Sequence, residues 1–426
     1  MFKRWVIVGL LTLVIGVNAS AAQDTTTISP ALLEQMNELE QTTQRLRELT
    51  AKEPVDHQFP TRTETIDYLR DLYSREFPPA EFERLKLFYV ALDLLPADID
   101  LQSVYLDLLG SQVAGFYDPD TKTMNVLPMV GDDPGTSLSF TEQVIYVHEF
   151  THALQDQYFD LNHLLESPDI QATPDRSLAT TALVEGDATA IMTLYTQQVA
   201  ARNPFAVLGM LVEGLQAGNL FLPPGIPPIL TDELLFPYED GMDFILALYK
   251  AGKWDAVNGA FASPPTTSEQ IIHPEKYLAG EGAQPVDLGD ASAALGADWT
   301  TPWDTTLGEF YLRESLAAQL DDADAERAAE GWGGDHFRVY QDATTGQIAW
   351  ALRLAWDSDA DAGEFADLYA DYGTARFGSA PDADGCWQDD GLALCFDPDA
   401  SLIASAPTSF CMTEVHQHQC LFGMTT

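Results

Sequence analysis

Basic residues are scarce in this chain, and their scarcity excludes two classes of partner. Only 21 of the 426 residues are Lys or Arg, against 66 Asp and Glu, so the formal net charge is −45 at pH 7. A protein this acidic repels phosphate backbones and anionic lipid headgroups. We therefore expect neither nucleic acid nor an anionic membrane surface as a partner, and we interpret the acidity chiefly as a solvated surface.

Long apolar runs are also scarce. One extends from Trp5 to Val17, after Lys3 and Arg4 and before the small residues of positions 19–21, ASA. This order is typical of a signal peptide over residues 1–22, and the run is too short to span a bilayer comfortably. No Cys follows it, so nothing indicates a lipid anchor. We expect a secreted or periplasmic protein with no stable membrane anchor after signal cleavage.

Cysteine is rare, and its four copies all lie near the end of the chain: Cys386, Cys395, Cys411 and Cys420. Export favours oxidation, so two local disulfides, 386–395 and 411–420, are the simplest of the three possible pairings. A four-Cys zinc site is the alternative, but the spacings contain no C-x-x-C pair. We expect these residues to be structural.

The most informative segment that is present is 140–158, which contains His148-Glu149-Phe150-Thr151-His152, an H-E-x-x-H pattern. Residues four apart lie on one face of a helix, so both imidazoles can reach a single metal ion. Glu149 then lies beside the open coordination position, where it can act as a general base. Chance also produces this pentad, on the order of once in a hundred such chains, so a metal site needs a third ligand.

The surrounding residues predict a helix independently of the motif. Ser139, followed three residues later by Glu142, is a capping box. We expect the metal-binding side chains to lie off the buried stripe and to open onto a cleft. The apolar residues that recur at helical spacing and predict this stripe are Val144, Val147, Phe150 and Leu154.

A third ligand is available on a second predicted helix, residues 177–200. The three-histidine pattern would need Gly at 155 and His at 158, where this chain has Gln155 and Tyr158. The other common solution is two histidines and a glutamate, and Glu185 is well placed after a turn and an antiparallel return. Small residues around it would let two helices approach closely: Ala182, Gly186 and Ala188.

The stretch 183–188, LVEGDA, resembles the "E-G-x-A" context of the ligand glutamate in the gluzincin superfamily of zinc metallopeptidases. The resemblance implies a zincin-like fold in which His148, His152 and Glu185 bind zinc (Zn2+). One position departs from the thermolysin-like branch, because Thr189 stands where that branch has an Asp that orients a ligand histidine. Asp187 is nearby but is expected to face elsewhere, so the partner of the histidines stays unassigned.

Two further segments could contribute donors to the reaction. Residues 236–241, FPYEDG, resemble the segment that carries an oxyanion-stabilising tyrosine in aminopeptidase-like gluzincins, and Tyr238 occupies the matching place. A simple tyrosine at a helix start is the alternative. His273 could supply a second donor, although a surface histidine before Pro274 is the plainer interpretation. The segments AGFYDP, SEQIIHPEKY and GWGGD together resemble an uncharacterised exported bacterial branch that carries this metal motif.

We expect a predominantly helical α+β chain. Residues 28–110 should form a helical N-terminal region of packing or prodomain-like function, with helices over 30–50, 63–77 and 79–95 and another toward 109. Residues 111–284 should form the zincin-like catalytic domain. In it, residues 112–127 predict a hairpin whose edge strand borders the cleft and pairs with extended substrate.

Residues 285–426 should form a C-terminal α+β module. The change to an Ala- and Asp-rich composition near 285 indicates this boundary. The expected helices are 307–320 and 362–377, and the expected strands are 334–340 and 347–356.

Three functions agree with these features. The first is a zinc metallopeptidase that acts on a peptide or protein, with Glu149 as general base and Tyr238 assisting the oxyanion. The second is a catalytically inactive binding protein on the same fold, which would have no need of Glu149. The third is a zinc hydrolase of another amide or ester.

Overall fold

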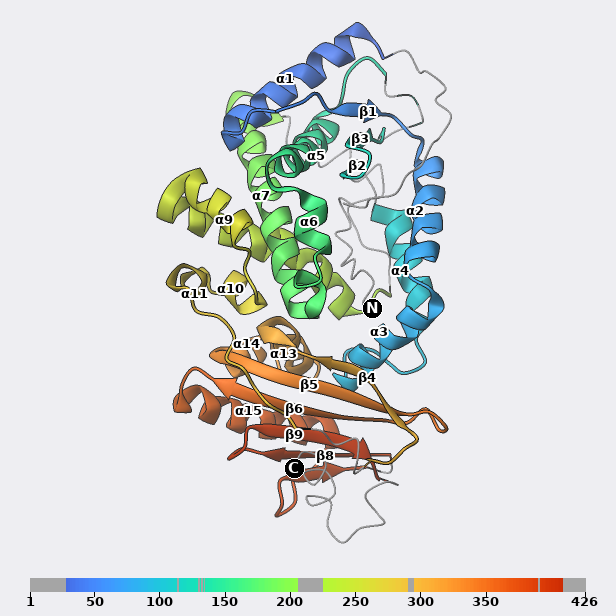
Figure 1. The fold of residues 1–426 in the computed structure, drawn as a ribbon, viewed down its shortest axis with the longest axis vertical. Coiled ribbons are helices and arrows are strands. Elements are labelled where there is room, and N and C mark those ends of the chain that lie inside the picture. Colours follow the sequence, from blue (N-terminus) through green and yellow to red (C-terminus); the bar gives the residue numbers. More distant parts are fainter. Residues whose placement is uncertain are drawn as a thin grey trace.

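The computed structural model describes residues 28–112, 115–128, 131, 133, 135–205, 225–289, 295–389 and 391–408. The predicted signal peptide and the predicted 411–420 disulfide lie outside these residues. The described chain is α+β and predominantly helical, which confirms the expected class. Helices occupy one end of the molecule and a larger sheet occupies the other (Figure 1). None of the described helices combines the length and apolarity needed to cross a membrane.

The helical end is built around three helices, α5, α7 and α9, with α1 packed against α5 and α7. Helix α9 is interrupted at Gly252 and Lys253, whose backbone angles are not helical. The helices of the described chain are α1 (Pro30–Arg47), α2 (Arg62–Glu76), α3 (Pro79–Ala91), α4 (Leu101–Gln112), α5 (Phe140–Phe159), α6 (Leu161–Glu166), the short 3-10 helix η1 (Ile170–Ala172), α7 (Pro174–Arg202), α9 (Pro228–Ala262), α10 (Ser268–Ile272), α11 (Pro274–Ala279), α13 (Gly308–Ala317), α14 (Asp322–Ala329) and α15 (Asp359–Phe377).

A small sheet lies beside α5. Strands β2 (Gly115–Asp118) and β3 (Thr123–Val126) form the predicted hairpin, and β1 (Asp56–Gln58) pairs in parallel with β3. The predicted helical region over residues 28–110 therefore contains one strand that was not predicted, β1, because this short segment gains its hydrogen bonds from a distant strand. The sheet order β1-β3-β2 leaves β2 as an edge strand, and β2 contacts α5.

The larger sheet is antiparallel and forms the C-terminal end of the molecule. Its strand order is β4 (Trp299–Thr305), β5 (Trp332–Asp342), β6 (Ile348–Trp356), β9 (Leu402–Pro407), β8 (Leu392–Asp397) and β7 (Cys386–Gln388). Helices α3 and α15 pack against this sheet. On α3, Phe88 lies 5.2 Å from Trp303 and 6.0 Å from Phe337 between ring centroids. The predicted N-terminal region is thus divided: α1 covers the helical end, whereas α3 belongs to the core of the sheet.

The predicted strands and helices of the C-terminal module correspond to β5, β6, α13 and α15. Four strands were not predicted: β4, β7, β8 and β9. The predicted disulfide between Cys386 and Cys395 is confirmed, and it joins facing residues of β7 and β8.

Helices α7 and α9 cross with almost no space between their backbones. A Cβ atom placed on Gly186 would lie 2.2 Å from the carbonyl oxygen of Gly241, and one on Gly241 would lie 2.3 Å from the carbonyl oxygen of Ala182. The small residues around Glu185 therefore do allow a close approach, and the partner helix is α9. Helix α9 begins at Pro228, so Tyr238 lies inside this helix and the interpretation as a helix-start tyrosine was wrong.

Two of the noted segments join the helical end to the larger sheet. In SEQIIHPEKY, the backbone N–H of Ser268 donates to Asp175 at 2.8 Å, and His273 Nε2 lies 3.0 Å from Glu309 Oε1. In GWGGD, Asp335 accepts from the backbone N–H groups that open α13. His273 thus takes part in this junction through its contact with α13.

Candidate metal centre

Helix α5 holds His148 and His152 on one face. Its capping box is present as predicted: Ser139 Oγ accepts from the backbone of Glu142 at 3.3 Å, and Glu142 Oε2 accepts from the backbone of Ser139 at 2.7 Å. The predicted apolar stripe is buried. This stripe fixes the rotation of the helix in the core and therefore the direction in which the two imidazoles project.

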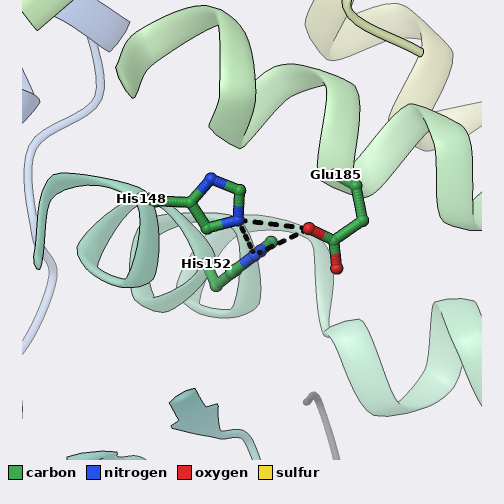
Figure 2. A group of neighbouring side chains, drawn as sticks. All are labelled: His148, His152 and Glu185. Carbon is green, nitrogen blue, oxygen red and sulfur yellow. Dashed lines mark hydrogen bonds and ion pairs between the residues drawn. The ribbon is translucent and has the colours of Figure 1, made fainter. Parts of the chain in front are cut away.

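Glu185 on α7 meets the two histidines of α5. Figure 2 shows the three side chains pointing toward one another across the gap between the helices. His148 Nε2 lies 3.0 Å from His152 Nε2 and 3.1 Å from Glu185 Oε2, and His152 Nε2 lies 3.4 Å from the same carboxylate oxygen. We call these three residues the ligand cluster. The arrangement brings together the three residues that the sequence predicted as metal ligands.

The spacing of the ligand cluster fits a single small cation. Zinc ligands lie about 2.0 to 2.2 Å from the ion, so two ligands of a tetrahedral site are separated by about 3.3 Å. The three measured separations are 3.0, 3.1 and 3.4 Å. The side chains are buried, with residue exposures of 3%, 0% and 3% for His148, His152 and Glu185. We expected them to open onto a cleft, and instead all three are buried among the described residues.

Electrostatics in the cluster also suits a cation. Burial on its own raises the pKa of a carboxyl group, but the two imidazoles outweigh it and lower the pKa of Glu185. Burial lowers the pKa of His148. At His152 burial acts in the same direction but is outweighed by the Glu185 carboxylate, so its pKa is raised. These directions favour negative charge on Glu185 and positive charge at His152, and a bound metal ion would supply the positive charge instead.

Glu149 lies on the same helix and is held by strand β2. The backbone N–H of Tyr117 donates to Glu149 Oε2 at 2.9 Å. Glu149 Oε1 is buried and has no hydrogen-bond partner among the described residues. Burial raises the pKa of Glu149 to about 8. With Oε2 held and Oε1 uncommitted, the ionised form of Glu149 can accept a proton at Oε1, as a general base requires.

Tyr238 lies beside the ligand cluster. Its ring stacks against His148 with 6.1 Å between ring centroids, and the residue is buried. The α7–α9 crossing places it there, because Gly241 lies one turn later on α9, where that helix meets α7 next to Glu185. The structure therefore brings together all five predicted site residues, although their roles remain predictions.

Sequence reasoning missed the residues that support His152. Its Nδ1 lies 2.8 Å from Gln155 Oε1, and Gln155 Nε2 donates to Asp187 Oδ2 at 2.9 Å. Asp187 in turn accepts from Arg47 Nε of α1. Asp187 does not reach the histidine directly, but it acts through Gln155. A signal was present, because Gln155 lies three residues after His152 and so on the same helix face.

Comparison with known proteins informs only the C-terminal module. Residues 296–416 match a family model described as "Domain of unknown function (DUF8575)". No curated protein and no solved structure matches the chain. The ligand cluster, Glu149 and Tyr238 all lie outside the matched residues.

Proposed function

We propose that this protein is an exported zinc-dependent metallopeptidase in which His148, His152 and Glu185 hold the zinc ion. The observation that carries the proposal is the convergence of two imidazole nitrogens and one carboxylate oxygen at 3.0 to 3.4 Å from one another. Two histidines and a glutamate are a donor set of catalytic zinc. When bound, zinc polarises a carbonyl group and lowers the pKa of a water molecule.

Glu149 would be the general base of the reaction. Its Oε2 is held by the Tyr117 N–H, which fixes the carboxylate and leaves Oε1 as the atom that takes a proton from the attacking water. The same carboxyl group would then return the proton to the leaving amine. A pure binding protein would have no use for a buried carboxyl group in this position, which favours the enzyme over the inactive alternative.

Tyr238 would stabilise the oxyanion that develops on the substrate carbonyl. Its phenol ring lies against His148 of the ligand cluster, and the residue is buried. A preorganised donor of this kind contributes about 3 kcal/mol to transition-state stabilisation.

The proposed catalytic domain is zincin-like and spans residues 111–284. Strand β2 is the edge of its small sheet, and its Tyr117 N–H reaches Glu149. An extended peptide that pairs with this edge would place its backbone beside the base. This supports a peptide or protein as the substrate.

The experiment that tests the proposal is Glu149→Gln, with zinc content and peptide hydrolysis measured on the same sample. We expect about one zinc ion per chain to be retained and hydrolysis to fall by about 10³-fold, because the base is lost and the ligands are not. Glu233→Gln is the matched control. Glu233 is also buried, but it accepts from Tyr89 and Tyr311 away from the ligand cluster, so zinc and activity should both persist.

The alternatives give different results. Zinc binding without hydrolysis of any substrate by the wild-type protein would indicate the inactive binding protein. Hydrolysis of amides or esters, but not of peptides, in a substrate panel would indicate a different zinc hydrolase. Unchanged hydrolysis in Glu149→Gln would refute the assignment of the base.

A further inference from the structure

Gln155 makes three hydrogen bonds that together determine which way its amide points. Its Nε2 donates to Asp187 Oδ2 and to the backbone carbonyl of Val184, both at 2.9 Å. Both partners are acceptors only, so the amide nitrogen must face them and the amide oxygen must face His152. Gln155 is fully buried, so water does not compete for these contacts. The orientation of the amide is therefore set by its surroundings.

This orientation fixes the protonation of His152. The Gln155 oxygen lies 2.8 Å from His152 Nδ1 and can only accept, so Nδ1 must carry a proton. In the neutral ring the lone pair is then on Nε2, the nitrogen that faces His148 and Glu185. A metal ligand needs its lone pair on this atom, and a hydrogen bond at the other ring nitrogen is the usual way in which proteins secure it.

Asp187 is held in turn by the last residue of α1. Arg47 Nε lies 2.8 to 2.9 Å from the two oxygens of Asp187, and Arg47 Nη2 donates to Asn258 Oδ1 at 2.8 Å. The guanidinium also lies over the ring of Trp254, 4.5 Å from its centroid. Arg47 and Asp187 are both fully buried. An ion pair this deeply buried keeps its geometry only while both partners remain.

We propose that Gln155, Asp187 and Arg47 are positioning residues that lock His152 in its metal-binding tautomer and orientation, and that α1 is thereby an integral part of the metal site. The inference rests on the proposed function. It also bears on the N-terminal region, because a prodomain that leaves the enzyme would take Arg47 with it. On this view α1 stays in place in the working protein.

The first test compares zinc affinity in Gln155→Leu and wild type, measured by competition with a chelator below the melting temperature of each. We expect the dissociation constant for zinc to rise 10- to 100-fold in Gln155→Leu, because His152 loses the acceptor that fixes its tautomer. The visible spectrum of the cobalt-loaded protein should change as well. Gln171→Leu is the matched control. Gln171 is a buried glutamine whose amide donates to the carbonyl of Leu165, and its loss should leave zinc affinity unchanged.

The second test asks whether Asp187 acts as an acceptor. Arg47→Met alone would leave a buried carboxylate without its cation, so it is combined with an uncharged residue at position 187. Arg47→Met with Asp187→Asn keeps an oxygen for Gln155, whereas Arg47→Met with Asp187→Leu removes it. We expect the double variant with Asp187→Asn to bind zinc at least several-fold more tightly than the double variant with Asp187→Leu.

Failure of this inference and failure of the proposed function give different results. If His148→Ala binds zinc as tightly as the wild-type protein, the assignment of the metal site is wrong. If His148→Ala loses zinc while Gln155→Leu keeps wild-type affinity, the proposed function stands and the positioning role is overturned. Equal affinities in the two double variants would overturn the role of Asp187.

Discussion

Two groups of potential metal ligands lie in the described part of the chain, and they differ in what holds them together. The ligand cluster consists of His148, His152 and Glu185. The second group, Glu269, Glu281 and Asp357, lies at the junction between the helical end and the larger sheet, and we call it the junction cluster. In each group the potential ligand atoms lie within 4.8 Å of one another.

The junction cluster already contains a cation from the chain itself. Lys276 Nζ lies 2.5 Å from Glu269 Oε1 and 3.5 Å from Glu281 Oε1, and it also pairs with Asp357. Burial on its own lowers the pKa of Lys276, but Asp357 and Glu269 outweigh it and raise that pKa. The ligand cluster instead offers two imidazoles and one carboxylate, a donor set that zinc, a borderline-soft cation, binds in catalytic sites. Proximity of acidic groups is therefore a weak indication of a metal site, because a side-chain cation such as the Lys276 ammonium can neutralise them instead.

The largest expected difference between the two clusters is in metal content. His152→Ala should lose the bound zinc and with it all hydrolysis above background, because two ligands cannot retain the ion against a chelator. Glu269→Gln should leave zinc content and activity at the wild-type level. Elemental analysis of both proteins after dialysis measures this. Loss of metal in Glu269→Gln and not in His152→Ala would reverse the assignment of the two clusters.

The next effect concerns how the ligand cluster is positioned. Gly241→Ala would place a methyl group against the Ala182 carbonyl at the α7–α9 crossing, where the Cβ contact is 2.3 Å. We expect a loss of about 3 kcal/mol in the free energy of unfolding, with weaker zinc binding because Glu185 is displaced. Gly259→Ala, on the same helix with nothing within 4 Å of the added Cβ, should instead stabilise the protein by about 0.5 to 1 kcal/mol. Chemical denaturation separates the two outcomes.

A smaller effect is expected at the junction cluster. Lys276→Met removes the cation from Glu269, which is buried, and from Asp357, which is partly solvated. We expect the free energy of unfolding to fall by about 2 kcal/mol, less than for a fully buried pair, with zinc affinity unchanged. If the free energy of zinc binding fell as much as the free energy of unfolding, the two clusters would be coupled, and their description as independent groups would be wrong.

The smallest effect is a pH dependence of stability at the junction. Burial raises the pKa of Asp335 to about 6, above the value of about 3.9 in an unfolded chain. The folded state therefore binds this proton more tightly, so the contribution of Asp335 to stability is full below pH 4 and is lost as the pH rises through 6. Asp335→Asn should flatten this fall, by on the order of 1 to 2 kcal/mol between pH 4 and 7, in urea unfolding.

Asp342→Asn gives a contrast on the same strand. Backbone N–H groups of Thr345 and Thr344 lower the pKa of this exposed carboxyl group. Its contribution to stability is present at higher pH and is lost as the pH falls. Asp342→Asn should therefore leave the decrease in the free energy of unfolding between pH 4 and 7 unchanged. An equal flattening in both variants would contradict the assignment to Asp335.

Local signals predicted the elements of the metal centre well. The capping box at Ser139 and Glu142 and the apolar stripe define α5 from neighbouring residues alone, so its helical structure could be read from the sequence. Strand β1 and the four strands of the larger sheet that were not predicted could not be recognised from neighbouring residues in this way. Their hydrogen bonds come from distant segments, and β1 has only three residues. Short strands carry too little periodicity to be recognised without their partners.

The sequence by itself determined which residues could bind a metal: two histidines one helical turn apart, and a glutamate in a segment of small residues. Only the tertiary structure decided that Glu185 reaches them, since this depends on how α7 packs against α5. It also decided that Arg47, more than a hundred residues before the histidine that it supports, belongs to the same buried network. Helix periodicity is a local property, whereas the meeting of three helices depends on how their surfaces pack, which a single sequence does not display.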